Sequence, residues 1–146
     1  MIANLEAGIK RQINADPALA RRFTILTSIP GIGPATAVAL IAGLHEIGEL
    51  SAKQAAMIAG LAPIACDSGE STGARHIQGG RIHLRTGVYM AAVSASRCNP
   101  DLKVFYQRLI AAGKLTKVAL TAVMRKLIIL ANTLVREDRL WQPNHA

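Results

Sequence analysis

Residues 26–40 read Leu-Thr-Ser-Ile-Pro-Gly-Ile-Gly-Pro-Ala-Thr-Ala-Val-Ala-Leu, a stretch in which two helical patterns meet at a turn. Its centre, residues 29–34, holds two prolines and two glycines, so a helix cannot run through it. We therefore predict one helix that ends at about Ser28 and another that runs from Pro34 to about Leu44. Ile29 and Ile32 are expected to fill the gap between these two helices.

Helical patterns continue on both sides of this turn. Segment 2–14 has one apolar stripe and is typical of the end of a longer helix or coiled coil. Asp16-Pro17 is an N-cap followed by proline, which opens the helix that ends near Ser28. Further helices are predicted at 51–59, opened by a capping box from Ser51 to Gln54, and at 81–97, 101–112 and 115–136. The expected fold class is mainly α.

The last predicted helix is the most apolar. Its apolar side is expected to hold Leu120, Val123, Met124, Leu127, Leu130, Ala131 and Leu134. Its polar side is expected to hold Lys117, Thr121, Arg125, Asn132 and Arg136. Because Arg125-Lys126 interrupts the apolar run Val118 to Leu134, we predict that it does not cross a membrane.

Residues 60–80 differ from the rest of the chain. They contain five glycines and lack helical periodicity, which predicts a Gly/Ser-rich loop with room for a small β-hairpin. The expected organisation is the end of a linking helix or coiled coil at 1–15, one domain at 16–141 and a tail at 142–146.

The charge of the chain lies in its second half. Residues 1–70 hold 5 basic and 6 acidic residues, whereas residues 71–146 hold 12 basic and 3 acidic ones, and the chain has a net charge of +8. A polyanion is therefore the first partner to consider. Aromatic residues make up only 3%, which argues against a base-stacking surface. Cys66 and Cys98 match no zinc-binding spacing and are expected to be reduced thiols.

Residues 26–40 resemble the helix–hairpin–helix module, which binds DNA phosphates without reading sequence. Gly31 and Gly33 would let the backbone approach a phosphate, and the amides at the start of the second helix would point at it. Pro34 lacks one such amide, and residues 26–40 contain no Lys or Arg. A tight turn between helices without a ligand is the alternative.

The 60–80 loop presents a candidate nucleophile. Asp67-Ser68-Gly69 is followed by Arg75, Arg81 and Arg85, which could neutralise the phosphate that a serine attacks. A base is less evident, since His76 and His83 are candidates only by proximity in sequence. An ordinary Ser-Gly turn is the alternative interpretation.

A longer series of motifs resembles one family. The series comprises Gly60-Leu-Ala-Pro63, Asp67-Ser-Gly69, Gly73, Ile77-Gln-Gly-Gly80, Leu84-Arg85, residues 89–92, 97–100 and 105–109, Gly113-Lys114, residues 117–120 and 124–127, and Trp141. Together, over about residues 20–141, they resemble the C-terminal transposase domain of the "IS one-ten" family of bacterial insertion-sequence transposases, also called DEDD transposases.

This resemblance implies a recombinase guided by a bridge RNA. A RuvC-like domain holds Mg²⁺ through Asp and Glu carboxylates, a coiled coil follows, and the transposase domain supplies a serine that becomes linked to DNA. The serine maps onto Ser68. The resemblance also implies a homo-oligomer, either a dimer or a dimer of dimers, and a cytoplasmic, nucleoid-associated location in bacteria.

The chain departs from the family pattern because a RuvC-like domain is missing, so no metal site is expected in it. We therefore expect a fragment that catalyses only together with such a domain. Lys114, Lys117, Arg125 and Lys126 are expected to contact DNA or RNA backbone. Two alternatives stay open: a non-catalytic helix–hairpin–helix module that binds nucleic acid, and a domain that only oligomerises.

Overall fold

The computed structural model describes residues 2–44, 46–51, 53–54, 57 and 82–143. The main helices of this part of the chain are α1 (Ile2–Ala15), α2 (Pro17–Thr27), α3 (Pro34–Gly43), α6 (Ile82–Cys98), α7 (Pro100–Ala111) and α8 (Thr116–Glu137). The described ranges contain no strand. The predicted fold class, mainly α, is confirmed, and these helix ends lie within about two residues of the predicted ones.

Local capping explains where several helices begin. The Asp16 carboxylate accepts hydrogen bonds from the amides of Ala18 and Leu19, with Pro17 in the first turn of α2. Asn99 caps α7 in the same way, ahead of Pro100. The predicted capping box is also confirmed, because the Ser51 amide donates to Gln54 Oε1 (2.9 Å) and the Gln54 amide donates to Ser51 Oγ (3.1 Å).

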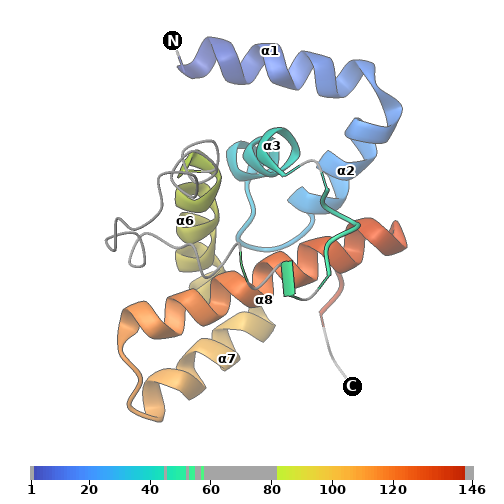
Figure 1. The fold of residues 1–146 in the computed structure, drawn as a ribbon. Coiled ribbons are helices and arrows are strands. Elements are labelled where there is room, and N and C mark those ends of the chain that lie inside the picture. Colours follow the sequence, from blue (N-terminus) through green and yellow to red (C-terminus); the bar gives the residue numbers. More distant parts are fainter. Residues whose placement is uncertain (1, 45, 52, 55–56, 58–81, 144–146) are drawn as a thin grey trace.

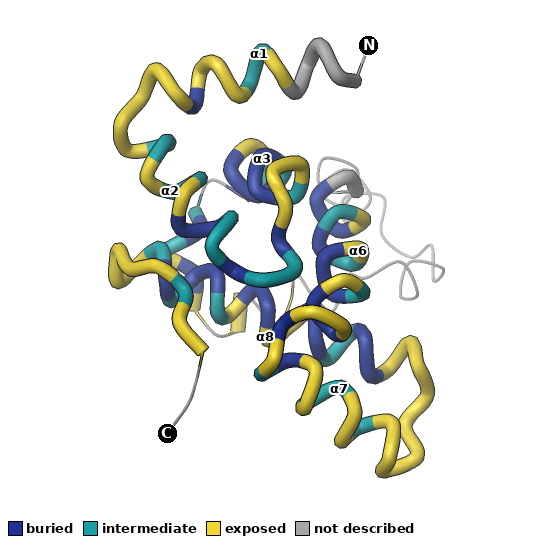
Figure 2. The backbone as a smooth tube through the Cα atoms, turned by 180° about the vertical axis from the view of Figure 1, so that it is seen from behind, coloured by how far each residue is buried: buried dark blue, intermediate teal, exposed yellow. Residues whose placement is uncertain are grey.

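Helix α8 crosses the whole molecule, and α2, α6 and α7 pack against it (Figure 1). Helix α3 lies on α2 and α6, and α1 extends along the edge formed by α2 and α3, far from α7. Buried positions concentrate on α8 and on the inner faces of α3 and α6, while α1 and α7 are mostly exposed (Figure 2). The core is therefore built around α8.

A seam of small residues joins α3, with the turn before it, to α6. A Cβ added to Gly43 would lie 3.4 Å from the Leu84 Cβ, and one added to Gly87 would lie 3.8 Å from the Ala39 Cβ. A Cβ added to Gly31 would lie 2.6 Å from the Ala95 Cβ. Along these three contacts the residue numbers fall from 43 to 31 in α3 and the turn before it, and rise from 84 to 95 in α6. The two segments therefore run antiparallel and pack closely.

The helical pattern predicts that Asn132 lies on the polar side of α8. In the structure this residue is buried, with only 4% of its surface exposed. Its Oδ1 accepts from the amides of Gly48 (2.7 Å) and Leu50 (3.0 Å), and its Nδ2 donates to the Leu50 carbonyl (3.0 Å). Arg136 Nη2 donates to the same carbonyl at 3.0 Å. The prediction was wrong because the loop at 48–50 covers this part of α8 and uses Asn132 as its hydrogen-bond partner.

By length and composition, α8 is apolar enough to cross a membrane, alone among the helices of the described ranges. Half of its most apolar window is buried inside the protein. Nine of its residues are buried, including Val123, Met124, Leu127 and Ile128. Its apolar composition is therefore explained by its place at the centre of the core.

Candidate nucleic-acid interface

The turn between α2 and α3, residues 28–33, is held from three directions. Ile29 and Ile32 are buried in the core, as expected for residues that pack inside the turn. Gly31 has a φ of +109° and lies directly against Ala95, which leaves no room for a side chain. Asn99 Nδ2 donates to the Pro30 carbonyl at 3.2 Å. The turn is therefore a rigid element.

The two glycines of this turn have different surroundings. Gly31 faces α6, so its structural role is close packing, and a phosphate contact there stays a prediction. Gly33 is the exposed N-cap of α3, and a Cβ added to it would meet nothing within 4 Å. Pro34 occupies the first turn, so only the amides of the residues after it could bind an anion at this helix start.

Ser68, Arg75 and Arg81 lie outside the described residues, as does the predicted loop with its possible β-hairpin. Described residues on both sides of this segment are anchored. Leu50 is held by Asn132 and Arg136, and α6 packs against α8 and α3. Arg85, near the start of α6, is only 6% exposed. Its guanidinium thus places a positive charge at a largely buried position close to where the segment ends.

The other predicted cations fall into two places. Lys114 and Lys117 lie at the α7–α8 tip, residues 111–118, all of which are exposed. Gly113 has a φ of +89° there, and the Lys114 amide donates to the Leu109 carbonyl, which closes the end of α7. These two lysines therefore share one surface that a nucleic-acid backbone could reach.

Arg125 and Lys126 lie instead along an open groove between α7, α8 and the C-terminal tail, with a volume of about 1020 Å³. The Lys126 ammonium lies 4.4 Å from the centre of the Phe105 ring, which lines the same groove. At this distance the ring face attracts the cation. The groove itself was not predicted, because its walls come from three separate segments.

The structure does not bring all predicted binding residues together. Gly31 packs at Ala95, which lies ten residues beyond Arg85 on α6 and thus about 15 Å along the helix axis. The described candidates therefore form separate groups: the 28–33 turn, the start of α6, the α7–α8 tip and the groove. Any one nucleic-acid strand would have to span several elements to touch them all.

The described residues offer no metal site. No group of three His, Cys, Asp or Glu side chains in the described ranges is placed to hold a metal ion. These residues thus do not fit the Mg²⁺ that the resemblance implies, and the expectation that another domain holds it stays a prediction. Cys98 is an exposed free thiol, and Cys66 lies outside the described residues.

Comparison with known proteins decides the family. Residues 23–107 match the model of the Transposase IS116/IS110/IS902 family. The chain belongs to this transposase family. The match covers the 28–33 turn, the position of Ser68 and all of α6, so the predicted resemblance is confirmed.

Several curated relatives agree with this assignment. The pilin gene-inverting protein of Moraxella bovis is 34% identical over 142 residues, which cover 94% of this chain and 44% of the relative. The insertion element IS110 uncharacterized 43.6 kDa protein of Streptomyces coelicolor is 29% identical over 140 residues, 94% of this chain and 34% of the relative. The transposase-family chain thus spans less than half the length of these relatives.

Proposed function

We propose that this domain supplies the nucleophile for DNA cleavage and strand transfer, with Ser68 as the attacking residue. The carrying observation is the family match, which runs through both sides of Ser68. A relative named for pilin gene inversion supports a rearrangement of DNA segments. In this proposal the domain acts with a RuvC-like domain that holds Mg²⁺, as the resemblance to the family implies.

The chemistry asked of Ser68 is a transesterification. Its Oγ forms a bond to phosphorus, the bond from phosphorus to the deoxyribose oxygen breaks, and the hydroxyl proton ends on that leaving oxygen. The phosphoserine ester conserves the bond energy, so a hydroxyl of a new strand can reverse the attack. Arg75, Arg81 and Arg85 would neutralise the phosphoryl oxygens, on which negative charge develops.

The scaffold around the segment supports this assignment. Asn132 and Arg136 fix Leu50 on one side, and the close packing of α6 on α3 and α8 fixes the other. Arg85 adds a cation that is largely shielded from water, where its attraction to a phosphate is stronger than at the surface. Fixed ends limit where the segment between them can place its side chains.

The wider nucleic-acid surface in this proposal combines the open start of α3 at Gly33 with Lys114 and Lys117. DNA and a guide RNA are the proposed partners, in a homo-oligomer that acts beside the nucleoid in the cytoplasm. The +9 balance of residues 71–146 supports backbone recognition by charge. Arg125 and Lys126, predicted as further backbone contacts, belong to the groove and are treated separately below.

A covalent-adduct assay tests the nucleophile. The chain is mixed with a RuvC-like domain of the same family, Mg²⁺, guide RNA and labelled target DNA, and protein–DNA adducts are separated by denaturing electrophoresis. We expect an adduct that Ser68→Ala abolishes and Ser71→Ala, a matched change of a nearby hydroxyl, preserves. An adduct that survives Ser68→Ala would show that another residue is the nucleophile.

A non-catalytic binding module is the second candidate, favoured by the basic second half and the rigid 28–33 turn. It predicts that the logarithm of the binding constant falls linearly with the logarithm of the salt concentration, with a slope of about −0.9 per phosphate neutralised. It also predicts that no covalent adduct forms. Binding without an adduct, in a mixture where a longer relative does form one, would favour this candidate. A flat salt dependence would contradict both candidates.

A further inference from the structure

The groove between α7, α8 and the tail has a volume of about 1020 Å³, and the proposed function makes no use of it. One wall comes from α7 through Leu102 and Phe105, and the floor comes from α8. The tail supplies the other wall through Arg139, Trp141 and the two residues after it. Since three segments build it, its shape depends on how firmly the tail is held.

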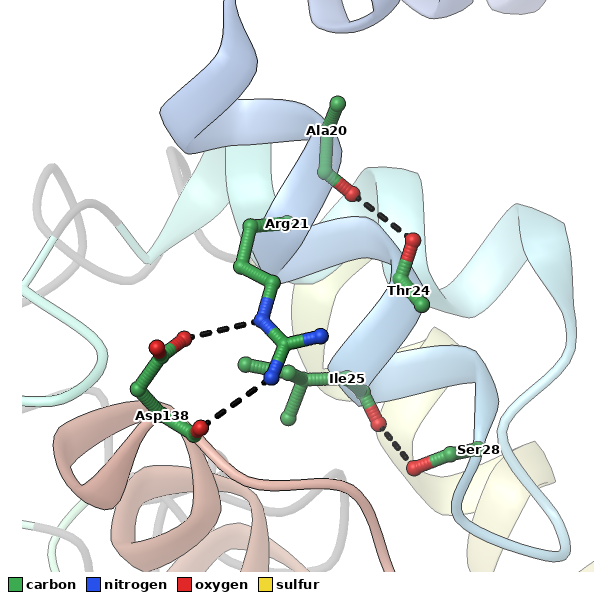
Figure 3. Close-up of polar contacts among 6 residues, drawn as sticks. All are labelled: Ala20, Arg21, Thr24, Ile25, Ser28 and Asp138. Atoms are coloured by element: carbon green, nitrogen blue, oxygen red, sulfur yellow. Dashed lines mark hydrogen bonds and ion pairs between the residues drawn. The ribbon is translucent and has the colours of Figure 1, made fainter.

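The tail is attached to α2 at two points. Arg21 Nε donates to Asp138 Oδ1 at 2.9 Å, and Arg21 Nη2 donates to the Asp138 carbonyl at 3.1 Å (Figure 3). Ser28 Oγ accepts from the Trp141 amide at 2.9 Å. The same hydroxyl donates to the Ile25 carbonyl (Figure 3). Trp141 is therefore held at the groove by its backbone hydrogen bond to Ser28.

The α8 floor of the groove carries a stripe of mainly apolar side chains. Val118, Ala122, Ile129 and Thr133 recur at spacings of four, seven and four residues along one face of α8. Val118 is 48% exposed and Ile129 is 36% exposed. The distance from Val118 to Thr133 is about 22 Å at the helical rise per residue, or about four turns. An amphipathic helix of similar length would bury these side chains.

The charged residues that line the groove select among possible occupants. Of its described lining residues, Arg125, Lys126 and Arg139 are cationic and Asp101 is acidic. A second copy's α1 is a poor match, because it carries Lys10 and Arg11. A nucleic-acid backbone would pair with the cations of the groove but would leave the apolar side chains of Val118, Ala122 and Ile129 uncovered. We propose that the groove binds an amphipathic helix of a protein partner whose polar flanks are acidic.

Trp141, the single tryptophan of the chain, allows a direct test. The probe is a synthetic 18-residue helical peptide with leucines at relative positions 1, 5, 8, 12 and 16 and glutamates beside them, designed to match the groove length. A second peptide replaces every glutamate with lysine. We expect a saturable shift of tryptophan emission with the glutamate peptide, and at least about tenfold weaker binding of the lysine peptide.

Variants locate the binding. Ile129→Ser should weaken binding of the glutamate peptide by about tenfold, and so should the double change Arg125→Glu with Lys126→Glu. Val104→Ser alters an exposed apolar residue of α7 that does not line the groove, so it should leave affinity unchanged. Circular dichroism of each variant checks that the helices remain folded.

Three results would overturn the proposal. The first is equal binding of the glutamate and lysine peptides, and the second is no shift with either peptide. The third is a shift produced by a single-stranded oligonucleotide that Arg125→Glu with Lys126→Glu abolishes, which would assign the groove to nucleic acid. None of these measurements depends on whether Ser68 is the nucleophile.

Discussion

The seam between α3 and α6 and the helix pair α7–α8 are built on opposite principles. The seam is made of glycine, alanine and leucine, and α3 has no charged residue at all. The α7–α8 pair carries exposed lysines and arginines next to exposed apolar side chains such as Val104 and Val118. The first region derives stability from close approach, whereas the second presents a varied surface to solvent.

This difference shows where binding can be separated from folding. A Cβ added at Gly31 would lie 2.6 Å from the Ala95 Cβ, and one added at Gly43 would lie 3.4 Å from the Leu84 Cβ, so the seam is tightest at the turn and has little freedom to change there. The α7–α8 tip has solvent around residues 111–118, so its charge can change with little effect on the fold. Substitutions that damage the seam should act on stability, and those at the tip should act on partners.

Gly31→Ala should have the largest effect on stability. The new Cβ would meet Ala95 at 2.6 Å and the φ of +109° is unfavourable for alanine. Strain and overpacking together should cost about 4 kcal/mol of unfolding free energy. Urea denaturation followed by circular dichroism measures this loss.

Gly33→Ala is the matched control, two residues away in the same turn. Its φ is −87° and its added Cβ has open space, so the loss should be below about 1 kcal/mol. Equal losses at the two glycines would mean that the turn does not pack on α6 as described. If only Gly33→Ala also weakens DNA binding, the open glycine is the one that approaches phosphate.

Asn132→Ala should have the next largest effect on stability. It should cost about 3 kcal/mol of unfolding free energy, because it removes the hydrogen-bond partner of two backbone amides and one carbonyl. Arg136→Ala removes exposed and part-buried hydrogen bonds to the same loop and should cost about 1 kcal/mol. The same denaturation assay compares them. A larger loss for Arg136→Ala would show that charge, rather than the buried amide, holds residues 48–50.

Leu102→Ala and Val104→Ala compare the two sides of α7. Leu102 is 5% exposed and Val104 is 55% exposed. Removing the buried side chain should cost about 2.5 kcal/mol, whereas removing the exposed one should cost below about 0.5 kcal/mol. Thermal unfolding of both variants measures the difference. Similar losses would mean that the outer face of α7 is covered in solution.

The helix ends could be predicted from sequence because their causes are local. Asp16, Ser51 and Asn99 cap helices through hydrogen bonds to amides two or three residues away. The role of Asn132 could not be predicted, because its partners are more than 80 residues away. Periodicity places a polar residue on the solvent side unless another segment covers it.

The candidate site was predicted less completely than the fold. Gly31 and Gly33 look equivalent in the sequence, and only the position of Ala95 separates their roles. The groove depends on the Arg21–Asp138 and Ser28–Trp141 contacts, which join residues more than 110 positions apart. Ser68 was identified through the family motif, and its role depends on the adduct assay.

The last prediction concerns the α7–α8 tip, where substitutions should have the smallest effect on unfolding free energy. Lys114→Ala together with Lys117→Ala removes two exposed cations and should leave unfolding free energy within about 0.5 kcal/mol of the parent. If both lysines contact phosphates, the slope of log affinity against log salt should fall by about 1.8. Fluorescence anisotropy with labelled duplex DNA from 50 to 200 mM salt, roughly the range where the effect is largest, measures it.

Lys10→Ala on α1, at the edge far from α7, is the control and should leave the slope unchanged. A slope that stays the same in the tip variant would remove these lysines from the interface. The binding charge would then come from other cations of the chain. Arg85 would be the next residue to test by the same slope, because it lies near the start of α6, close in sequence to the segment that holds the proposed nucleophile, whereas the tip is open to solvent on its own.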